Sequence, residues 1–325
     1  MKAIVYTKYG PPDLLEYKEV KRPSPKDGQV LVRVRAASVN ALDYRRFEKT
    51  SPIGRLMDEA LLRSVGKVLG ADIAGQVEAV GPGATRFRPG DEVFGVSAGL
   101  VGAFAEYACA AQHQLALKPQ NISFAAAAAV PVAASTALKS LREAAKIQPG
   151  QKVLIHGASG GVGTFAVQIA KSYEAEVTAV CSTRNLDIAH SAGADHVIDY
   201  TREDFTRGER RYDVIIAVNG DRSPLEYRRA LSTGGVCVVV GGSTRQIFGA
   251  MLFGPWASMF GERKIGAMGV AKVSLDSLAT LHQLLSAGKI VPVIDRSYPL
   301  AETAKAIQYL VEEHARGKVV ITCGT

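Results

Sequence analysis

The stretch that decides the fold is Val153-Leu154-Ile155-His156-Gly157-Ala158-Ser159-Gly160-Gly161-Val162-Gly163-Thr164-Phe165-Ala166-Val167-Gln168. A short apolar run passes through a glycine-rich turn into a helical segment. Side chains at the three spaced glycines would hold the backbone away from a pyrophosphate, which binds at the positive N-terminus of a helix. The stretch therefore predicts a strand, turn and helix that bind a dinucleotide.

The sequence around this motif alternates between strand and helix. Short β-branched runs separated by helices of about a dozen residues are typical of a parallel sheet covered on both faces. We therefore expect a doubly wound α/β region, with strands at 152–156, 176–181, 196–200, 213–218 and 236–241 and helices at 161–172, 185–192 and 224–231.

The first 118 or so residues have a different pattern, of short β runs separated by turns rich in glycine and proline, such as Pro23–Gly28. This pattern predicts an antiparallel or barrel-like β domain. The alanine-rich segment Ser123–Lys146 predicts a helix or helix pair that leads into the second region. The closing β run, Gly317–Thr322, is expected to return to the first.

Composition excludes several classes of protein. The apolar stretches Phe124–Ala134 and Gly249–Phe260 are shorter than the roughly 20 residues of a membrane helix, so we expect no stable membrane insertion. The net charge is +8, but Arg and Lys are spread along the chain, which argues against a nucleic-acid partner. Four scattered cysteines and an opening strand without a secretory signal indicate free thiols and a cytoplasmic protein.

The cofactor is predicted from the end of the second strand of the α/β region, Val180-Cys181-Ser182-Thr183-Arg184-Asn185. An acidic residue there would bind the 2′-hydroxyl of NAD. This end carries none, and the hydroxyl groups of Ser182 and Thr183 with the Arg184 guanidinium suit a 2′-phosphate. We therefore expect NADPH. The alternative is that Arg184 only begins the next helix in solvent.

Short motifs at 37–44, 70–77, 89–95, 102–107, 157–163 and 317–320 occur in the order of a known family. Over nearly its whole length the chain resembles the medium-chain dehydrogenase/reductase superfamily and, within it, the zinc-independent quinone oxidoreductase-like, or zeta-crystallin-like, branch. The resemblance implies a GroES-like β domain formed by residues 1–124 and 291–325, and a Rossmann doubly wound parallel-sheet domain at 125–290. It also implies a homodimer.

Zinc-dependent members of this superfamily carry Cys near Ser38 and Gly-His-Glu where this chain has Gly70-Ala71-Asp72. A catalytic zinc needs three protein ligands and an open position. Because these residues cannot supply the usual Cys and His, no metal is expected. Without a Lewis acid, the acceptor is expected to take hydride readily, as a small apolar quinone or enone does.

The resemblance also implies functional residues. Asn40 corresponds to the place where nicotinamide and substrate meet, although a turn-capping role is the alternative. Tyr44 is the nearest candidate proton donor, but its offset from the family's tyrosine does not match cleanly and a packed core tyrosine is the alternative. Asp43 and Asp72 are expected to stabilise the domain by hydrogen bonding. The implied cofactor-binding residues are Thr136, Gly157, Ser159, Gly160, Gly161, Val162, Gly163, Ser182, Thr183, Arg184, Tyr200, Val218, Gly241, Gly242 and Lys318.

These observations predict hydride transfer from NADPH to a quinone or an α,β-unsaturated carbonyl. The resulting oxyanion or enolate would be stabilised by backbone amides or Asn40 and protonated by solvent or Tyr44. The alternatives are a zinc-free NADP-dependent alcohol or carbonyl dehydrogenase, and a non-catalytic NADPH-binding protein of the crystallin-like or RNA-contacting kind. The Met- and Phe-rich segment Phe248–Phe260, which holds Trp256, is expected to form a homodimer contact or a flap over an apolar acceptor, with plain core packing as the alternative.

Overall fold

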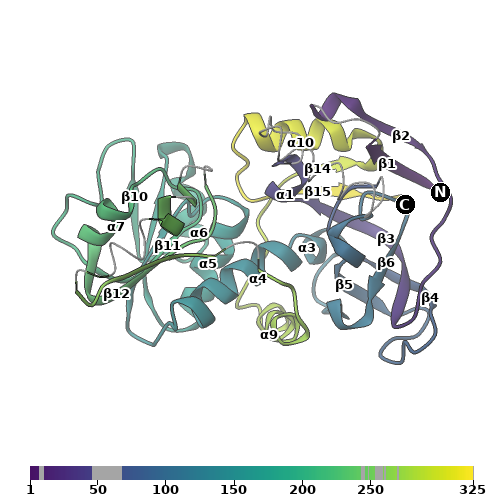
Figure 1. Ribbon diagram of the computed structural model, residues 1–325, viewed down its shortest axis with the longest axis horizontal. Coiled ribbons are helices and arrows are strands. Elements are labelled where there is room, and N and C mark those ends of the chain that lie inside the picture. Colours follow the sequence, from purple (N-terminus) through teal and green to yellow (C-terminus); the bar gives the residue numbers. More distant parts are fainter. Residues whose placement is uncertain are drawn as a thin grey trace. The chain divides into compact units, whose positions relative to one another are not determined.

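The computed structural model describes residues 1–6, 11–45, 68–242, 246–247, 249–252, 259, 261–268 and 271–324. The chain divides into two compact units (Figure 1). The first, called the β unit here, comprises residues 1–132, 273–286 and 294–325. The second, called the α/β unit, comprises residues 133–272 and 287–293.

Most strands of the β unit are antiparallel. Strand β1 (Lys2–Tyr6) pairs with β2 (Leu15–Glu19), and β15 pairs with β3, so the closing strand returns to the first β region as expected. Only the β14–β15 pair is parallel among the described strands of the larger sheet. That sheet has the order β14 (Ile294–Pro299), β15 (Lys318–Thr322), β3 (Gln29–Val39), β4 (Asp72–Val80), β5 (Glu92–Val96) and β7 (Leu115–Leu117), with β6 (Tyr107–Ala111) also on β3.

Helices cover the sheet of the β unit. The amphipathic α10 (Thr303–Glu312) contributes Ala306 and Ile307 to a core that also holds Ile73 and Phe104. The other described helices are α1 (Ala41–Arg45), α3 (Phe124–Ala128) and α9 (Leu275–Ser286), with 3₁₀ turns at Pro12–Leu14, Ala98–Leu100, Gln112–Gln114 and Leu300–Glu302.

The α/β unit is built on a parallel sheet, which confirms the doubly wound prediction. Its order is β10 (His196–Asp199), β9 (Glu176–Cys181), β8 (Lys152–His156), β11 (Tyr212–Ala217), β12 (Leu231–Val239) and β13 (Lys264–Ala267), the order of a dinucleotide-binding fold. The described helical segments are α4 (Pro131–Lys139), a π-helical turn (Ser140–Ala144), α5 (Gly161–Ser172), a 3₁₀ turn (Thr183–Asn185), α6 (Leu186–Ser191) and α7 (Pro224–Ala230).

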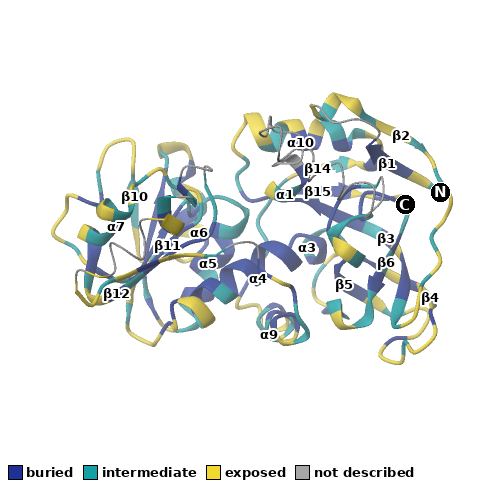
Figure 2. Ribbon diagram, viewed as in Figure 1, coloured by how far each residue is buried: buried dark blue, intermediate teal, exposed yellow. Residues whose placement is uncertain are grey.

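Buried residues concentrate in the central strands of both units, whereas the outer strands β2, β13 and β14 are largely exposed or half-buried (Figure 2). The central strands β8 and β11 are almost wholly buried, as expected for a sheet with two covered faces. None of the helices in the described part of the chain is long and apolar enough to cross a membrane. The four cysteines are free.

The compact units differ from the predicted domain limits, 1–124 with 291–325 and 125–290. Helix α3 packs on β3 and β4, and α9 packs on β7, so both helices belong to the β unit. Asn121 Nδ2 donates to the Leu285 carbonyl at 3.0 Å and ties the end of α9 to this unit. The apolar spacing of α9 indicates a buried face, but spacing does not indicate which sheet that face covers.

Candidate functional site

The carboxyl ends of β8 and β11 meet at the point where the strand order of the α/β unit reverses. From β8 the chain continues to β9 and β10 on one side, and β11 lies on the other side. His156 is paired with Ala217, and the Val218 amide donates to the His156 carbonyl at 2.9 Å. Ligands of open α/β sheets bind at such a switch point.

The glycine-rich turn lies at this switch point. Gly157 has a φ of +85°, and a Cβ on Gly163 would lie 2.1 Å from the Gly157 carbonyl oxygen, so helix α5 packs directly on the turn. Gly160, the N-cap of α5, gives no side-chain hydrogen bond to the first amides. These amides and the helix dipole therefore form a cradle that fits a pyrophosphate.

The neighbouring loops complete this edge of the sheet. A Cβ on Gly241 would lie 2.5 Å from the Val218 carbonyl oxygen, so the turns after β11 and β12 are in close contact. Gly242 has a φ of +101°. The structure thus brings Gly157–Gly163, Val218, Gly241 and Gly242 to one sheet edge, whereas Thr136 lies buried in α4.

The predicted 2′-phosphate region contains a carboxylate that the sequence reasoning missed. Thr183 Oγ1 donates to Asp199, the last residue of β10, and Asp199 also accepts two hydrogen bonds from Thr201. The pKa of Asp199 is lowered, chiefly by the Thr183 hydrogen bond. The premise that this edge lacks a carboxylate is therefore wrong, because β10 is paired with β9 and ends beside it.

The cationic and aromatic residues of this region are more exposed to solvent than Asp199. Arg184 is exposed in the 3₁₀ turn, and the Tyr200 side chain, directly after Asp199, is 50% exposed. Ser182 Oγ accepts from Asn185 Nδ2 at 3.0 Å. Arg202 lies 3.6 Å from Asp199 through Nε and partly offsets its charge. The edge therefore holds both positive and negative groups.

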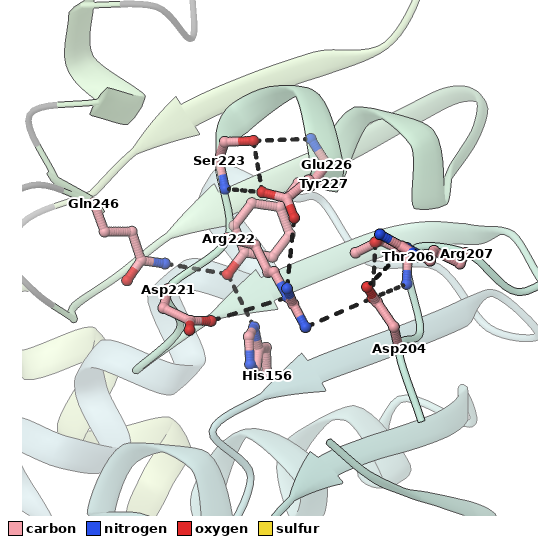
Figure 3. A network of polar contacts seen from close by, with 10 residues as sticks. All are labelled: His156, Asp204, Thr206, Arg207, Asp221, Arg222, Ser223, Glu226, Tyr227 and Gln246. Atoms are coloured by element: carbon pink, nitrogen blue, oxygen red, sulfur yellow. Dashed lines mark hydrogen bonds and ion pairs between the residues drawn. The ribbon is translucent and has the colours of Figure 1, made fainter. Parts of the chain in front are cut away.

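His156 forms a buried hydrogen-bonded group that was not predicted from the sequence. Its Nδ1 lies 2.9 Å from Tyr227 Oη, which accepts from Gln246 Nε2 at 3.1 Å (Figure 3). The Phe205 ring contacts the imidazole edge-on at 5.1 Å between centroids. The group joins the last residue of β8 to α7 and to the segment after β12.

Burial controls the charge of this histidine. Burial lowers the pKa of His156 to about 4, although Asp221 and Asp204 oppose the shift. The imidazole is therefore neutral at pH 7. A Cβ on Gly220 would lie 2.2 Å from Tyr227 Oη and 2.6 Å from His156 Nδ1, so only glycine leaves room for this pair.

A set of ion pairs lies beside the histidine. Arg222 lies 3.5 Å from Glu226, 3.7 Å from Asp204 and 3.9 Å from Asp221 (Figure 3). Ser223 caps α7, accepting from the Glu226 amide while the Glu226 carboxylate accepts from the Ser223 amide. The charged turn that follows β11 is thus held on α7.

A second polar cluster lies inside the β unit. Asp72 accepts from Ser38 Oγ at 2.8 Å, from Asn40 Nδ2 at 2.9 Å and from the Val132 amide at 3.0 Å. Lys318 Nζ donates to Asn40 Oδ1 at 2.7 Å and lies 3.6 Å from Asp72. All five residues of this cluster are buried, Val132 included.

The remaining contacts of this cluster fix the chain that follows β3. The Asn40 amide donates to Asp43 Oδ2 at 2.8 Å, and the Asp43 amide donates to the Asn40 carbonyl at 3.0 Å. Asp43 and Asp72 therefore hydrogen-bond within the unit in the way expected of structural residues.

Burial shifts both charged groups of the cluster. The pKa of Asp72 is raised because burial disfavours the carboxylate, with Lys318 and the donated hydrogen bonds acting in the opposite direction. The pKa of Lys318 is lowered because burial disfavours the ammonium, with Asp72 and Asp43 opposing. Lys318 was expected to approach a cofactor, yet the contacts found for its ammonium are all within the β unit.

Two expectations involve residues outside the described part of the chain. The Tyr44 side chain is one, although its backbone lies in α1. Phe253 and Trp256 of the Met- and Phe-rich segment are the others. Within the described residues, no group of three or more His, Cys, Asp or Glu side chains could hold a metal ion. Absence of zinc stays a prediction.

Comparisons with known proteins place this geometry in a family. Residues 26–120 match the alcohol dehydrogenase GroES-like domain, and residues 192–321 match the zinc-binding dehydrogenase domain. A chloroplastic quinone-oxidoreductase homolog from Spinacia oleracea is 32% identical, over 99% of this chain and 98% of its own. A chloroplastic NADPH-dependent alkenal/one oxidoreductase from Arabidopsis thaliana is 33% identical, over 99% of this chain and 79% of its own.

A solved structure agrees with these relatives. The Escherichia coli quinone oxidoreductase complexed with NADPH has a TM-score of 0.83 and 25% identity, and the match covers 99% of this chain and 100% of that one. The match spans both units, as does the match to the two curated relatives. The chain therefore belongs to the medium-chain dehydrogenase/reductase superfamily and, within it, to the oxidoreductases of the quinone oxidoreductase family.

Proposed function

We propose that this oxidoreductase uses NADPH to reduce a small apolar quinone or an α,β-unsaturated carbonyl compound. The observation that carries the proposal is the uncapped N-terminus of α5 behind the Gly157–Gly163 turn at the switch point of the sheet. The curated relatives named for quinones and for NADPH-dependent alkenal/one reduction match the sequence over nearly the whole chain, and the solved quinone oxidoreductase complexed with NADPH shares this architecture.

The α/β unit supplies the cofactor site in this proposal. The first amides of α5 bind the pyrophosphate, and Thr183 with Arg184 faces the 2′-phosphate. Tyr200, half exposed beside them, covers the adenosine. Val218, Gly241 and Gly242 border the nicotinamide. When bound, NADPH supplies the hydride for the reduction.

The two side chains predicted to act in the reaction, Asn40 and Tyr44, both belong to the β unit. Both Asn40 amide hydrogens have acceptors inside the unit, Asp72 Oδ2 and the Ser38 carbonyl. Of the two donors predicted for the oxyanion or enolate, backbone amides are therefore favoured over Asn40. The proton that completes the reduction comes from solvent or Tyr44, whose role is tested by Tyr44→Phe.

Cofactor choice is tested by Arg184→Ala. Loss of one charge-assisted contact of about 1.5–3 kcal/mol should raise the NADPH Michaelis constant roughly tenfold to a hundredfold and leave that for NADH nearly unchanged. Arg207→Ala, at another exposed arginine, is the matched control for the lost charge. Equal losses with both cofactors would contradict the 2′-phosphate assignment.

Asp199→Asn provides the complementary test. If the Asp199 carboxylate disfavours a 2′-phosphate through its contact with Thr183, its removal should shift preference further toward NADPH. Weaker NADH binding with NADPH binding unchanged would instead assign Asp199 to the ribose hydroxyls, and an unchanged preference would show that Asp199 acts on neither group.

The acceptor is tested by following NADPH oxidation with quinones, enones, aldehydes and ketones side by side, together with alcohol oxidation by NADP⁺. Quinone or enone turnover should exceed the rest. Faster alcohol oxidation would favour a zinc-free alcohol dehydrogenase. Tight NADPH binding without turnover of any acceptor would indicate a non-catalytic binding protein.

We also propose a homodimer and a cytoplasmic location. Met251, Leu252 and Met259 are 60%, 68% and 78% exposed, which suits a surface that a second copy covers. Sedimentation of the wild type and of Leu252→Ser tests the dimer. If Leu252→Ser has the same mass in solution as the wild type, this segment is excluded as the dimer contact. Imaging of a tagged full chain tests the cytoplasmic location.

A further inference from the structure

Tyr227 is a buried tyrosine whose hydroxyl group joins three separate segments of the α/β unit. Its Oη lies 2.9 Å from His156 Nδ1 and accepts from Gln246 Nε2 at 3.1 Å (Figure 3). His156 is the last residue of β8, Tyr227 lies in α7, and Gln246 follows β12. Buried polar groups of this kind stabilise a unique arrangement when their partners are in place.

Packing within the α/β unit sets the place of this hydroxyl. Ser223 caps α7 about one turn before Tyr227, and the Tyr227 ring belongs to an apolar cluster that includes Phe205. Burial raises the pKa of Tyr227 well above its ordinary value, so the phenol keeps its hydrogen. Because Gln246 donates to the phenol oxygen, this hydrogen is available to the neutral imidazole of His156.

The turn after β11 rests on the tyrosine and histidine pair. A Cβ on Gly220 would lie 2.6 Å from His156 Nδ1 and closer still to Tyr227 Oη, so the Gly220 backbone packs directly on both groups. A Cβ on Gly157 would lie 2.9 Å from the Asn219 nitrogen, which places the glycine-rich turn against the same segment. The pair therefore sets the spacing between these two turns.

The turn after β12 meets the same group. A Cβ on Gly242 would lie 3.1 Å from the Gly220 carbonyl oxygen and would collide with the Gln246 side chain. Gln246, which donates to Tyr227, thus holds this turn beside the other two. Asn219, by contrast, is exposed, so the outer side of the turn after β11 is open to a ligand.

The strand order divides a bound dinucleotide between the two sides of the switch point. In folds of this order the adenosine ribose binds at the end of the second strand, which is β9 here. The other half of the cofactor then lies beyond β8, over the ends of β11 and β12. The turns that Tyr227 supports are those of this second side.

We infer that Tyr227 is a positioning residue for the cofactor, whose buried hydroxyl holds the turns on the nicotinamide side of the switch point at a fixed spacing. The inference rests on the proposed function, in which Val218, Gly241 and Gly242 border the nicotinamide. Because Tyr227 is only 1% exposed, it acts through the turns packed on it and not by contact with the cofactor.

Tyr227→Phe tests this action, because it removes the hydroxyl and keeps the buried ring. The variant should lower kcat/KM for NADPH roughly tenfold to a hundredfold, since misplaced reacting groups carry penalties of that size. The dissociation constant of adenosine 2′,5′-bisphosphate, a fragment confined to the adenosine half, should stay unchanged. Tyr212→Phe is the matched control: Tyr212 is equally buried at the opposite end of β11, and its loss should leave kcat/KM nearly unchanged.

Three results would overturn the inference. An unchanged kcat/KM in Tyr227→Phe would show that the hydroxyl does not position the cofactor. Fragment binding weakened by the same factor as kcat/KM would show a general loosening of the α/β unit. An equal loss of kcat/KM in Tyr212→Phe would show that removal of any buried hydroxyl from this unit has the same effect.

A second variant keeps the inference testable if Tyr227→Phe does not fold. Gly220→Ala leaves the hydroxyl and both partners in place but pushes the turn after β11 away from them. It should therefore lower kcat/KM and leave fragment binding unchanged, and an unchanged kcat/KM would overturn the inference.

Failure of the proposed function is seen separately, as a wild type that binds NADPH but turns over neither quinones nor enones. In that case the ratio of the NADPH to the fragment dissociation constant replaces kcat/KM as the measure. Tyr227→Phe should still raise this ratio, and an unchanged ratio would overturn the inference.

Discussion

Replacing His156 by Asn should remove a pH-dependent part of the stability of the α/β unit. Burial lowers the pKa of His156 to about 4, whereas an unperturbed histidine titrates at 6.5. Because the folded pKa lies below the unfolded one, the neutral imidazole favours the fold above pH 6.5. This contribution is lost as pH falls towards 4, where the unfolded chain binds a proton that the folded chain does not.

The size of the effect follows from the two pKa values. A separation of about 2.5 units corresponds to about 3.4 kcal/mol when fully expressed. Between pH 7.5 and 5 the wild type should lose about 2 kcal/mol from this group, and by pH 4 about 3 kcal/mol. The variant also loses the Tyr227 contact, but that loss is a constant offset and does not change with pH.

The assay is urea unfolding followed by far-ultraviolet circular dichroism at several pH values from 7.5 to 5. The difference in unfolding free energy between wild type and His156→Asn should shrink by about 2 kcal/mol over this range. His190→Asn, at an exposed position on α6, is the matched control. Parallel curves for wild type and His156→Asn would refute the buried neutral histidine.

Three other changes have defined outcomes. Gly220→Ala places a Cβ 2.2 Å from Tyr227 Oη and should cost about 1–3 kcal/mol by overpacking, whereas Gly266→Ala, with nothing within 4 Å, should be nearly neutral in the same melts. Ser223→Ala removes the cap of α7 and should cost about 1 kcal/mol, and an unchanged melting temperature would show that the cap contributes nothing. Exhaustive chelation should leave activity intact, and one zinc per chain by elemental analysis would contradict the reading of positions 38, 71 and 72.

The local elements of the α/β unit were predictable because their signals act over a few residues. Strand β8, helix α5 and strand β9 begin and end at the predicted residues, 152–156, 161–172 and 176–181. Alternation of β-branched runs with helical spacing, together with glycine at the turns, determines such elements without reference to the rest of the chain. The order of these elements then indicates a doubly wound sheet.

Contacts between elements were decided by tertiary structure alone. Asp199 meets Thr183 because β10 pairs beside β9, and no spacing along the chain marks that contact. Helix α9 has an apolar face in the sequence, yet only packing assigns it to the β unit.

The glycine-rich turn and the buried His156 and Lys318 side chains show the same difference between what local sequence indicates and what tertiary contacts decide. Glycine at 157 and 163 was informative by itself: the φ of +85° at Gly157 favours glycine, and glycine at 163 lets helix α5 pack on the Gly157 carbonyl. His156 carried no such signal, because a histidine in an apolar run is compatible with many environments. For Lys318 the resemblance implied an approach to the cofactor, whereas the contacts of its ammonium lie within the β unit. The roles of both side chains depend on partners 71 and 278 residues away, Tyr227 and Asn40, which strand pairing and the return of the closing strand bring into hydrogen-bonding distance.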